Sequence, residues 1–121
     1  MEKLINIEKY ILYLDKNNNV FNNQITFDNE QSIRLYDYLY IMQMVYYAKY
    51  GKKLFNEKIN INNYMNIKDT YNFKNLENKR FIEIIFNALQ YAPLNDLNKI
   101  VSDSKKEDYK EKCLDFISLL D

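Results

Sequence analysis

The residue types that most enzymes use for acid–base, nucleophilic and metal chemistry are sparse in this 121-residue chain. It has no histidine, so neither a Ser-His-Asp nor a Cys-His arrangement can form, and the commonest zinc ligand is missing. Its single glycine cannot build a phosphate-binding loop. Catalysis would therefore depend on carboxylates or on the one cysteine.

The carboxylates are scattered, and the closest spacings join Glu77 with Glu83 and Glu107 with Asp108 and Glu111. Such spacings on helices are typical of solvated faces rather than of a paired acid and base. We therefore predict no catalytic residues. A carboxylate-dependent enzyme stays a less favoured hypothesis, which single replacements would test at Glu57, Asp69 and Glu83.

Cys113 is the only cysteine, so no internal disulfide can form and a reducing, cytoplasmic setting fits. It lies in the apolar phase of a predicted helix, which favours a buried small hydrophobe over a reactive thiol. No apolar run is long enough to span a bilayer or resembles a signal peptide. We predict a soluble, cytoplasmic protein with no metal, no cofactor and no membrane contact.

The charge balance bears on the partners. Lys+Arg and Asp+Glu both number 17, so the formal net charge is 0. A nucleic-acid binder needs a basic surplus to displace counterions, and this chain has none. Direct nucleic-acid binding is therefore disfavoured, and a protein partner is favoured. A homo-oligomer stays open.

Tyrosine is the residue type that best suits a binding function here. Six of the twelve tyrosines lie in the apolar stretch of residues 35–50: Tyr36, Tyr38, Tyr40, Tyr46, Tyr47 and Tyr50. They cannot all point to one side of a helix, and buried phenolic groups need hydrogen-bond partners. Core packing explains some of them, whereas others could form a protein-binding face, because tyrosine is enriched in interface hot spots.

The elements that would position these residues are mainly helices. A helix over residues 28–50, with Asp28 as N-cap and Gly51 as C-cap, is too apolar for a surface and would be buried on most sides. Further helices are predicted over residues 1–15 with Asn6 as a candidate N-cap, from Glu77, after Pro93, and over residues 105–120. We expect one compact domain, residues 1–121, with four to five helices around the central one.

Three apolar faces are predicted for the outer helices. They comprise Phe81, Ile82, Ile84, Ile85, Ala88 and Leu89; then Leu94, Leu97, Ile100 and Val101; and then Tyr109, Cys113, Phe116, Ile117 and Leu120. Two weaker segments alternate in the manner of strands, residues 20–27 and the part of residues 52–75 that carries Ile59, Ile61 and Met65. They are candidates for a small β-hairpin.

The central stretch, LYDYLYIMQMVYYAKYGKKLF, resembles the signature of the Panacea (SocA-like) domain, whose pattern runs approximately LQKLLYFAQ, then Y, then GKPLF. The matching positions are Leu35, Leu39, Tyr40, Gln43, Gly51, Leu54 and Phe55. Flanking segments from Ile5 and from Ala92 are similar to the opening and closing parts of the family. The chain departs from it after Phe55, where Glu57 and Tyr64 fit but the Tyr-Gly-Pro-Val motif is missing.

The resemblance implies a compact helical domain and a phage-associated antitoxin that neutralises a toxin by direct binding. The alternative is a phage-encoded anti-defence protein, of the anti-CRISPR type, that inhibits a host nuclease. We predict the partner-binding surface at Tyr36, Tyr47, Tyr50, Glu57, Tyr64 and Tyr71.

Overall fold

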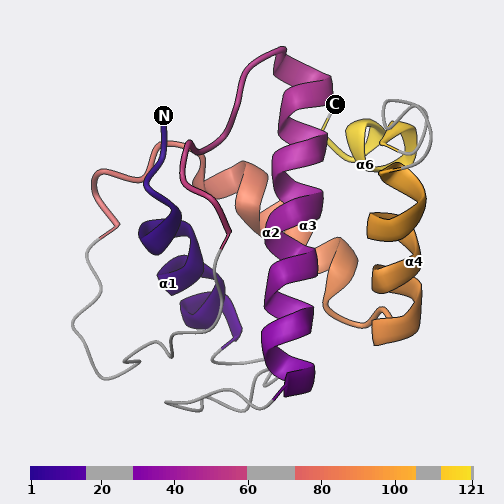
Figure 1. Cartoon of the computed structure of the whole chain (residues 1–121). Coiled ribbons are helices and arrows are strands. Elements are labelled where there is room, and N and C mark those ends of the chain that lie inside the picture. The colour runs from indigo at the N-terminus through magenta and orange to yellow at the C-terminus, as the bar shows by residue number, and fades with distance from the viewer. Residues whose placement is uncertain (16–28, 60–72, 106–112, 121) are drawn as a thin grey trace.

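The computed structural model describes residues 1–15, 29–59, 73–105 and 113–120. This part of the chain is mainly helical, as predicted (Figure 1). Its helices are α1 (Leu4–Asp15), α2 (Asn29–Tyr50), α3 (Lys79–Leu89), α4 (Leu94–Ser104) and the short α6 (Leu114–Ser118).

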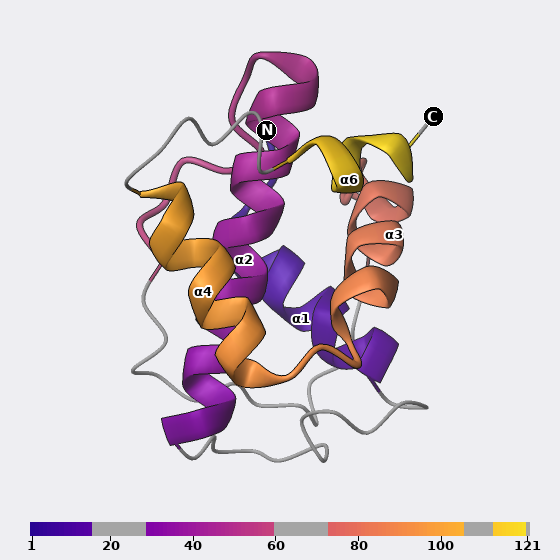
Figure 2. The same ribbon diagram turned by 90° about the vertical axis from the view of Figure 1, so that its right-hand side faces the viewer.

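Helix α2 forms the middle of the molecule, with α3, α4 and α6 packed against it and α1 packed against α3 (Figures 1 and 2). Its side chains at Leu39, Met42 and Val45 have no exposed surface. The predicted central helix is confirmed over Asn29–Tyr50, while Asp28 lies outside the described residues. Truncating a fully buried leucine such as Leu39 removes about 2–5 kcal/mol of stability, so this helix contributes much of the core.

Gly51 ends α2 as predicted. Its φ is 71°, in the left-handed region that other residues avoid. Its backbone N–H donates to the carbonyl of Tyr47 at 2.9 Å. The chain therefore reverses sharply at Gly51, and the next residues run back along α2.

Polar groups at the other end of α2 tie it to the turn between α3 and α4. The hydroxyl of buried Tyr38 donates to the carbonyl of Leu89 at 3.1 Å, and Arg34 donates to the carbonyl of Ala92 at 3.0 Å. Tyr38 is thus one of the tyrosines that belong to the core. Pro93 precedes the first residue of α4 as its N-cap, and Leu97 and Val101 are buried as predicted.

Three details of the helix predictions are wrong. Asn6 is not an N-cap, because α1 already begins at Leu4 and the backbone N–H of Asn6 bonds to the carbonyl of Lys3. In α3, Phe86 is buried and Ala88 is exposed, because the side of the helix that faces the core includes the larger phenylalanine ring. The helix predicted over residues 105–120 is absent at Lys105 and Cys113, which lie in turns on either side of the undescribed residues 106–112, and α6 spans only Leu114–Ser118.

The inward positions predicted for the last segment are confirmed where they are described. Cys113 is fully buried, and Phe116, Ile117 and Leu120 pack half-buried against the core. Tyr109 and most of the predicted hairpin lie outside the described residues. Within the described ranges, no helix has the length and apolarity needed to cross a membrane.

Candidate functional site

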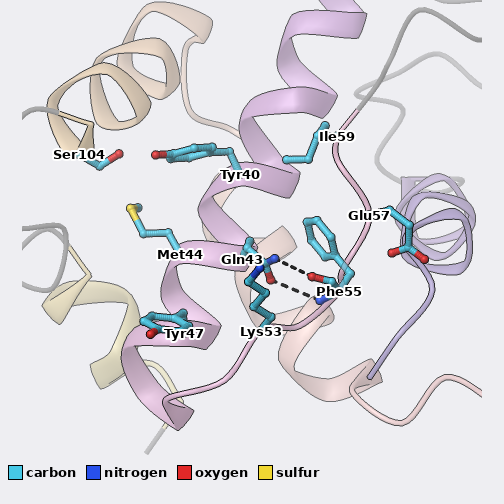
Figure 3. A pocket seen from close by; sticks show the side chains of 9 residues that line it. All are labelled: Tyr40, Gln43, Met44, Tyr47, Lys53, Phe55, Glu57, Ile59 and Ser104. Carbon is cyan, nitrogen blue, oxygen red and sulfur yellow. Dashed lines mark hydrogen bonds between the residues drawn. The ribbon is translucent and has the colours of Figure 1, made fainter.

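A groove of about 410 Å³ lies along one side of α2 (Figure 3). Tyr40, Met44 and Tyr47 follow one another down this side of the helix, at the spacing of three and four residues that aligns side chains on one helix face. We call this cavity the α2 groove. It is lined by Tyr40, Gln43, Met44, Tyr47, Lys53, Phe55, Glu57, Ile59 and Ser104.

One side of the groove is formed by residues 52–59, which we call the wall segment. The side-chain amide of Gln43 holds this segment to α2: its nitrogen donates to the carbonyl of Phe55 at 2.8 Å (Figure 3). Its oxygen accepts from the N–H of Leu54 at 2.7 Å. On its other edge, Leu54 accepts from the N–H of Glu2 at 2.9 Å, beside an isolated parallel bridge between Glu2 and Phe55. The wall segment is therefore fixed from two sides.

An aromatic stack continues the groove floor toward the start of α2. The rings of Tyr36 and Tyr40 are nearly parallel, with centroids 6.2 Å apart. The ammonium of Lys105 lies 5.7 Å from the first ring centroid and 5.2 Å from the second. Such cation–π contacts contribute about 0.5–1 kcal/mol at exposed sites, and they place a cation at this end of the floor.

One glutamate, Glu57, lines the groove, and it is an exposed residue. The Glu57 carboxylate points toward α1, where one of its oxygens accepts from the N–H of Leu4 at 3.3 Å (Figure 3). Behind it, burial and then the charge of Glu57 raise the pKa of Glu8 from 4.5 to about 7. Glu8 of α1 therefore lies near Glu57 of the wall segment, and Glu8 does not line the groove.

Asp37 lies beneath the aromatic end of the floor and is 3% exposed. Burial raises its pKa from 3.8 to about 6, although the charges of Lys105 and Arg34 act in the opposite direction. Its Oδ2 atom has no hydrogen-bond partner among the described residues. Asp37 therefore places a counter-charge for Lys105 inside the protein rather than on its surface.

The predicted partner-binding residues fall into three groups. Tyr47, 44% exposed, and Glu57 line the groove, and Tyr36 belongs to the stack at its end. Tyr50 lies on another face of α2, against Tyr46 and Phe81. Tyr64 and Tyr71 lie outside the described residues. The structure thus brings Tyr36, Tyr47 and Glu57 to one surface and leaves Tyr50 apart.

Sequence reasoning missed much of the groove lining. Tyr40 could have been predicted from the sequence, because it lies four residues after Tyr36 and seven before Tyr47, on the same helical face. No pattern indicated Ser104 or Lys105, which α4 brings beside α2 from far along the chain. Gln43, an apparent polar interruption of α2, anchors the wall segment.

The remaining candidates for chemistry do not meet in the groove. Glu83 accepts a short hydrogen bond from the hydroxyl of Tyr10, while Glu77 is exposed. Burial raises the pKa of the Cys113 thiol to about 11, which makes it a poor nucleophile. In the described part of the chain, no three potential metal-ligating side chains gather. Asp69 and the cluster at residues 107–111 lie outside it.

Comparisons of the chain with protein-family models, with curated proteins and with solved structures find no match. The resemblance to the Panacea signature therefore rests on the residues of the central stretch alone. The structure assigns those residues clear roles: Leu35, Leu39, Leu54 and Phe55 are buried, and Gln43 and Gly51 shape the turn and the wall segment.

Proposed function

We propose that this chain is a non-catalytic inhibitor that neutralises a partner protein by binding it, as an antitoxin of the Panacea type would. The α2 groove is the surface we assign to the partner. The observation that carries the proposal is the groove floor, an aromatic and apolar strip in which half-buried Tyr40 and exposed Tyr47 flank the buried Met44.

This floor has the properties of a protein-binding surface. Tyrosine and methionine are enriched in interface cores, and a tyrosine loses little conformational entropy when it is immobilised. The strip stands on a rigid helix whose opposite faces are packed in the core, and Gln43 fixes the neighbouring wall segment. Such preorganisation lowers the entropic cost of binding.

The polar groups of the groove favour binding over turnover. The hydroxyl of Ser104 donates to the carbonyl of Val101 at 2.8 Å, so it is not presented to a general base. The amide of Gln43 is occupied by the wall segment, and the Glu57 carboxylate faces α1. None of these arrangements matches an activated nucleophile.

The test compares two tyrosines on the same helix. The tagged wild-type chain, Tyr47→Ala and Tyr50→Ala would each be used for affinity purification from the source organism, with mass spectrometry of the retained proteins. The two positions are similarly exposed, at 44% and 49%, but only Tyr47 lines the groove. We expect Tyr47→Ala to weaken a specific complex by about 1–2 kcal/mol, roughly five- to thirtyfold.

Tyr50→Ala is the matched control, and it should retain the partner. Equal retention by both variants, with unchanged circular dichroism, would contradict the assignment of the groove. The identity of the retained protein then separates a toxin from a host defence nuclease. In either case, titrating the chain into an assay of that partner should abolish its activity near a one-to-one ratio.

A further inference from the structure

We infer that the α2 groove receives an acidic segment of the partner, with an apolar side chain inserted between acidic residues. This inference rests on the proposed function and specifies the chemistry of the partner. It follows from the way charge is distributed around the apolar floor.

In the described part of the chain, the exposed charges at the two ends of the groove are cationic. Lys53, which belongs to the wall segment, lines the groove and is exposed. Lys105, also exposed, lies over the rings of Tyr36 and Tyr40 at the other end. A partner that covers the floor must pass close to both ammonium groups.

Within the described ranges, the nearby carboxylates are directed away from these two cations. Asp37 is 3% exposed, and Glu57, although it is an exposed residue of the groove lining, directs its carboxylate away from the groove to the start of α1. A basic segment would be repelled by the positive charges of Lys53 and Lys105. A purely apolar segment would remove water from both ammonium groups without supplying a counter-charge. An acidic segment is the one that complements both.

The middle of the groove selects an apolar side chain. The rings of Tyr40, Tyr47 and Phe55 and the thioether of Met44 surround a space of about 410 Å³. From Tyr36 to Tyr47 the helix rises roughly 16 Å, which about five extended residues also span. One apolar anchor with carboxylates on both sides therefore fits the length of the floor.

The experiment selects ligands without assuming the partner. A phage-displayed library of random twelve-residue peptides would be selected on the immobilised full-length chain, and the recovered peptides measured by fluorescence anisotropy. We expect enrichment of Asp and Glu on both sides of an aliphatic or aromatic residue. Affinity should fall when NaCl rises from about 50 to about 500 mM, because salt screens exposed charges.

Charge-reversal variants locate the site. Lys53→Glu should weaken the selected peptides about tenfold or more. Lys99→Glu makes the same charge change at an exposed position of α4 that does not line the groove, and it should change affinity less than about twofold. Lys105→Glu should act like Lys53→Glu. Because Lys105 also faces Asp37, its thermal unfolding must be compared with that of the wild type.

Three outcomes would overturn the inference: recovered peptides that lack acidic residues, peptides that bind wild type and Lys53→Glu equally, or no specific peptide at all. Failure of the proposed function looks different. In one case, Tyr47→Ala loses the partner protein, whereas Lys53→Glu still binds it in high salt. That result would contradict the acidic ligand and leave the proposed function intact. In the other case, acidic peptides bind the groove but no partner protein is inhibited. That result would contradict only the proposed function.

Discussion

Glu8 is a residue at which burial and a neighbouring charge both act against ionisation. It is a carboxylate only 9% exposed, with Glu57 as a charged neighbour. Burial disfavours the ionised form, and a second carboxylate disfavours it further, so the pKa rises from 4.5 to about 7. The folded protein therefore binds a proton at Glu8 more tightly than the unfolded chain does.

This pKa difference predicts a pH-dependent effect of Glu8→Gln. The contribution of Glu8 to stability is present below pH 4.5 and is lost as pH rises to about 7, because only the folded state resists ionisation. Glutamine resembles the protonated form and cannot ionise. The variant should match wild type near pH 4 and exceed it at pH 8 in unfolding free energy, by on the order of 3 kcal/mol.

Urea unfolding at a series of pH values measures this difference. Glu77→Gln is the control, since it makes the same substitution at an exposed position. A difference for Glu8→Gln that does not change with pH would show that the carboxylate is hydrated in the folded protein. The pair would then contribute nothing to the pH dependence of stability.

At the scale of elements, the helices follow from local pattern, whereas the groove does not. The unbroken apolar run of α2 and the single glycine after it were enough to predict Asn29–Tyr50 and the turn. Local reasoning failed where tertiary contacts decide. Phe86 rather than Ala88 faces the core, and Cys113 lies in a turn just before α6 rather than inside a helix.

The wall segment shows why the site was harder to predict than the helices. Residues 52–59 have no regular period, and their position depends on a side-chain amide from α2 and on the backbone of Glu2. A polar residue within an apolar helix is read from sequence as an interruption. Only the three-dimensional structure shows that Gln43 satisfies backbone groups of Leu54 and Phe55.

Gln43→Met tests this attachment. Methionine has a similar length but forms no such hydrogen bonds, so the buried backbone groups at Leu54 and Phe55 lose their partners. We expect an unfolding free energy lower by about 2–4 kcal/mol, together with faster hydrogen exchange of the Leu54 amide. Gln90→Met is the control: the amide nitrogen of Gln90 makes only 3.5 Å contacts with Asn87, and its buried amide oxygen has no hydrogen-bond partner among the described residues, so this substitution should not lower the free energy of unfolding. A loss as small as that of the control would mean that the wall segment is held by apolar packing alone.

At the scale of the whole molecule, the core is one cluster that draws on every described helix except the short α6, and it reaches Cys113 just before α6. The groove likewise combines three distant parts of the chain: α2, the wall segment and Ser104 of α4. Its integrity therefore depends on the packing of the whole domain. Cys113 provides a single chemical probe of that packing, because its side chain is fully buried.

We predict that Cys113 reacts with iodoacetamide at pH 8 at least about a hundredfold more slowly in the folded protein than in urea. Burial raises the thiol pKa from 9.0 to about 11, which alone lowers the reactive thiolate by about two orders of magnitude, and burial also blocks access. Mass spectrometry of quenched samples gives the rate.

The same measurement on Leu39→Ala, which weakens the core of α2, tests whether the protein opens cooperatively. If it does, the reaction should accelerate in proportion to the loss of global stability. Acceleration would be absent if the segment at Cys113 opened by itself, and a folded rate equal to that in urea would show that the segment is not docked on α2.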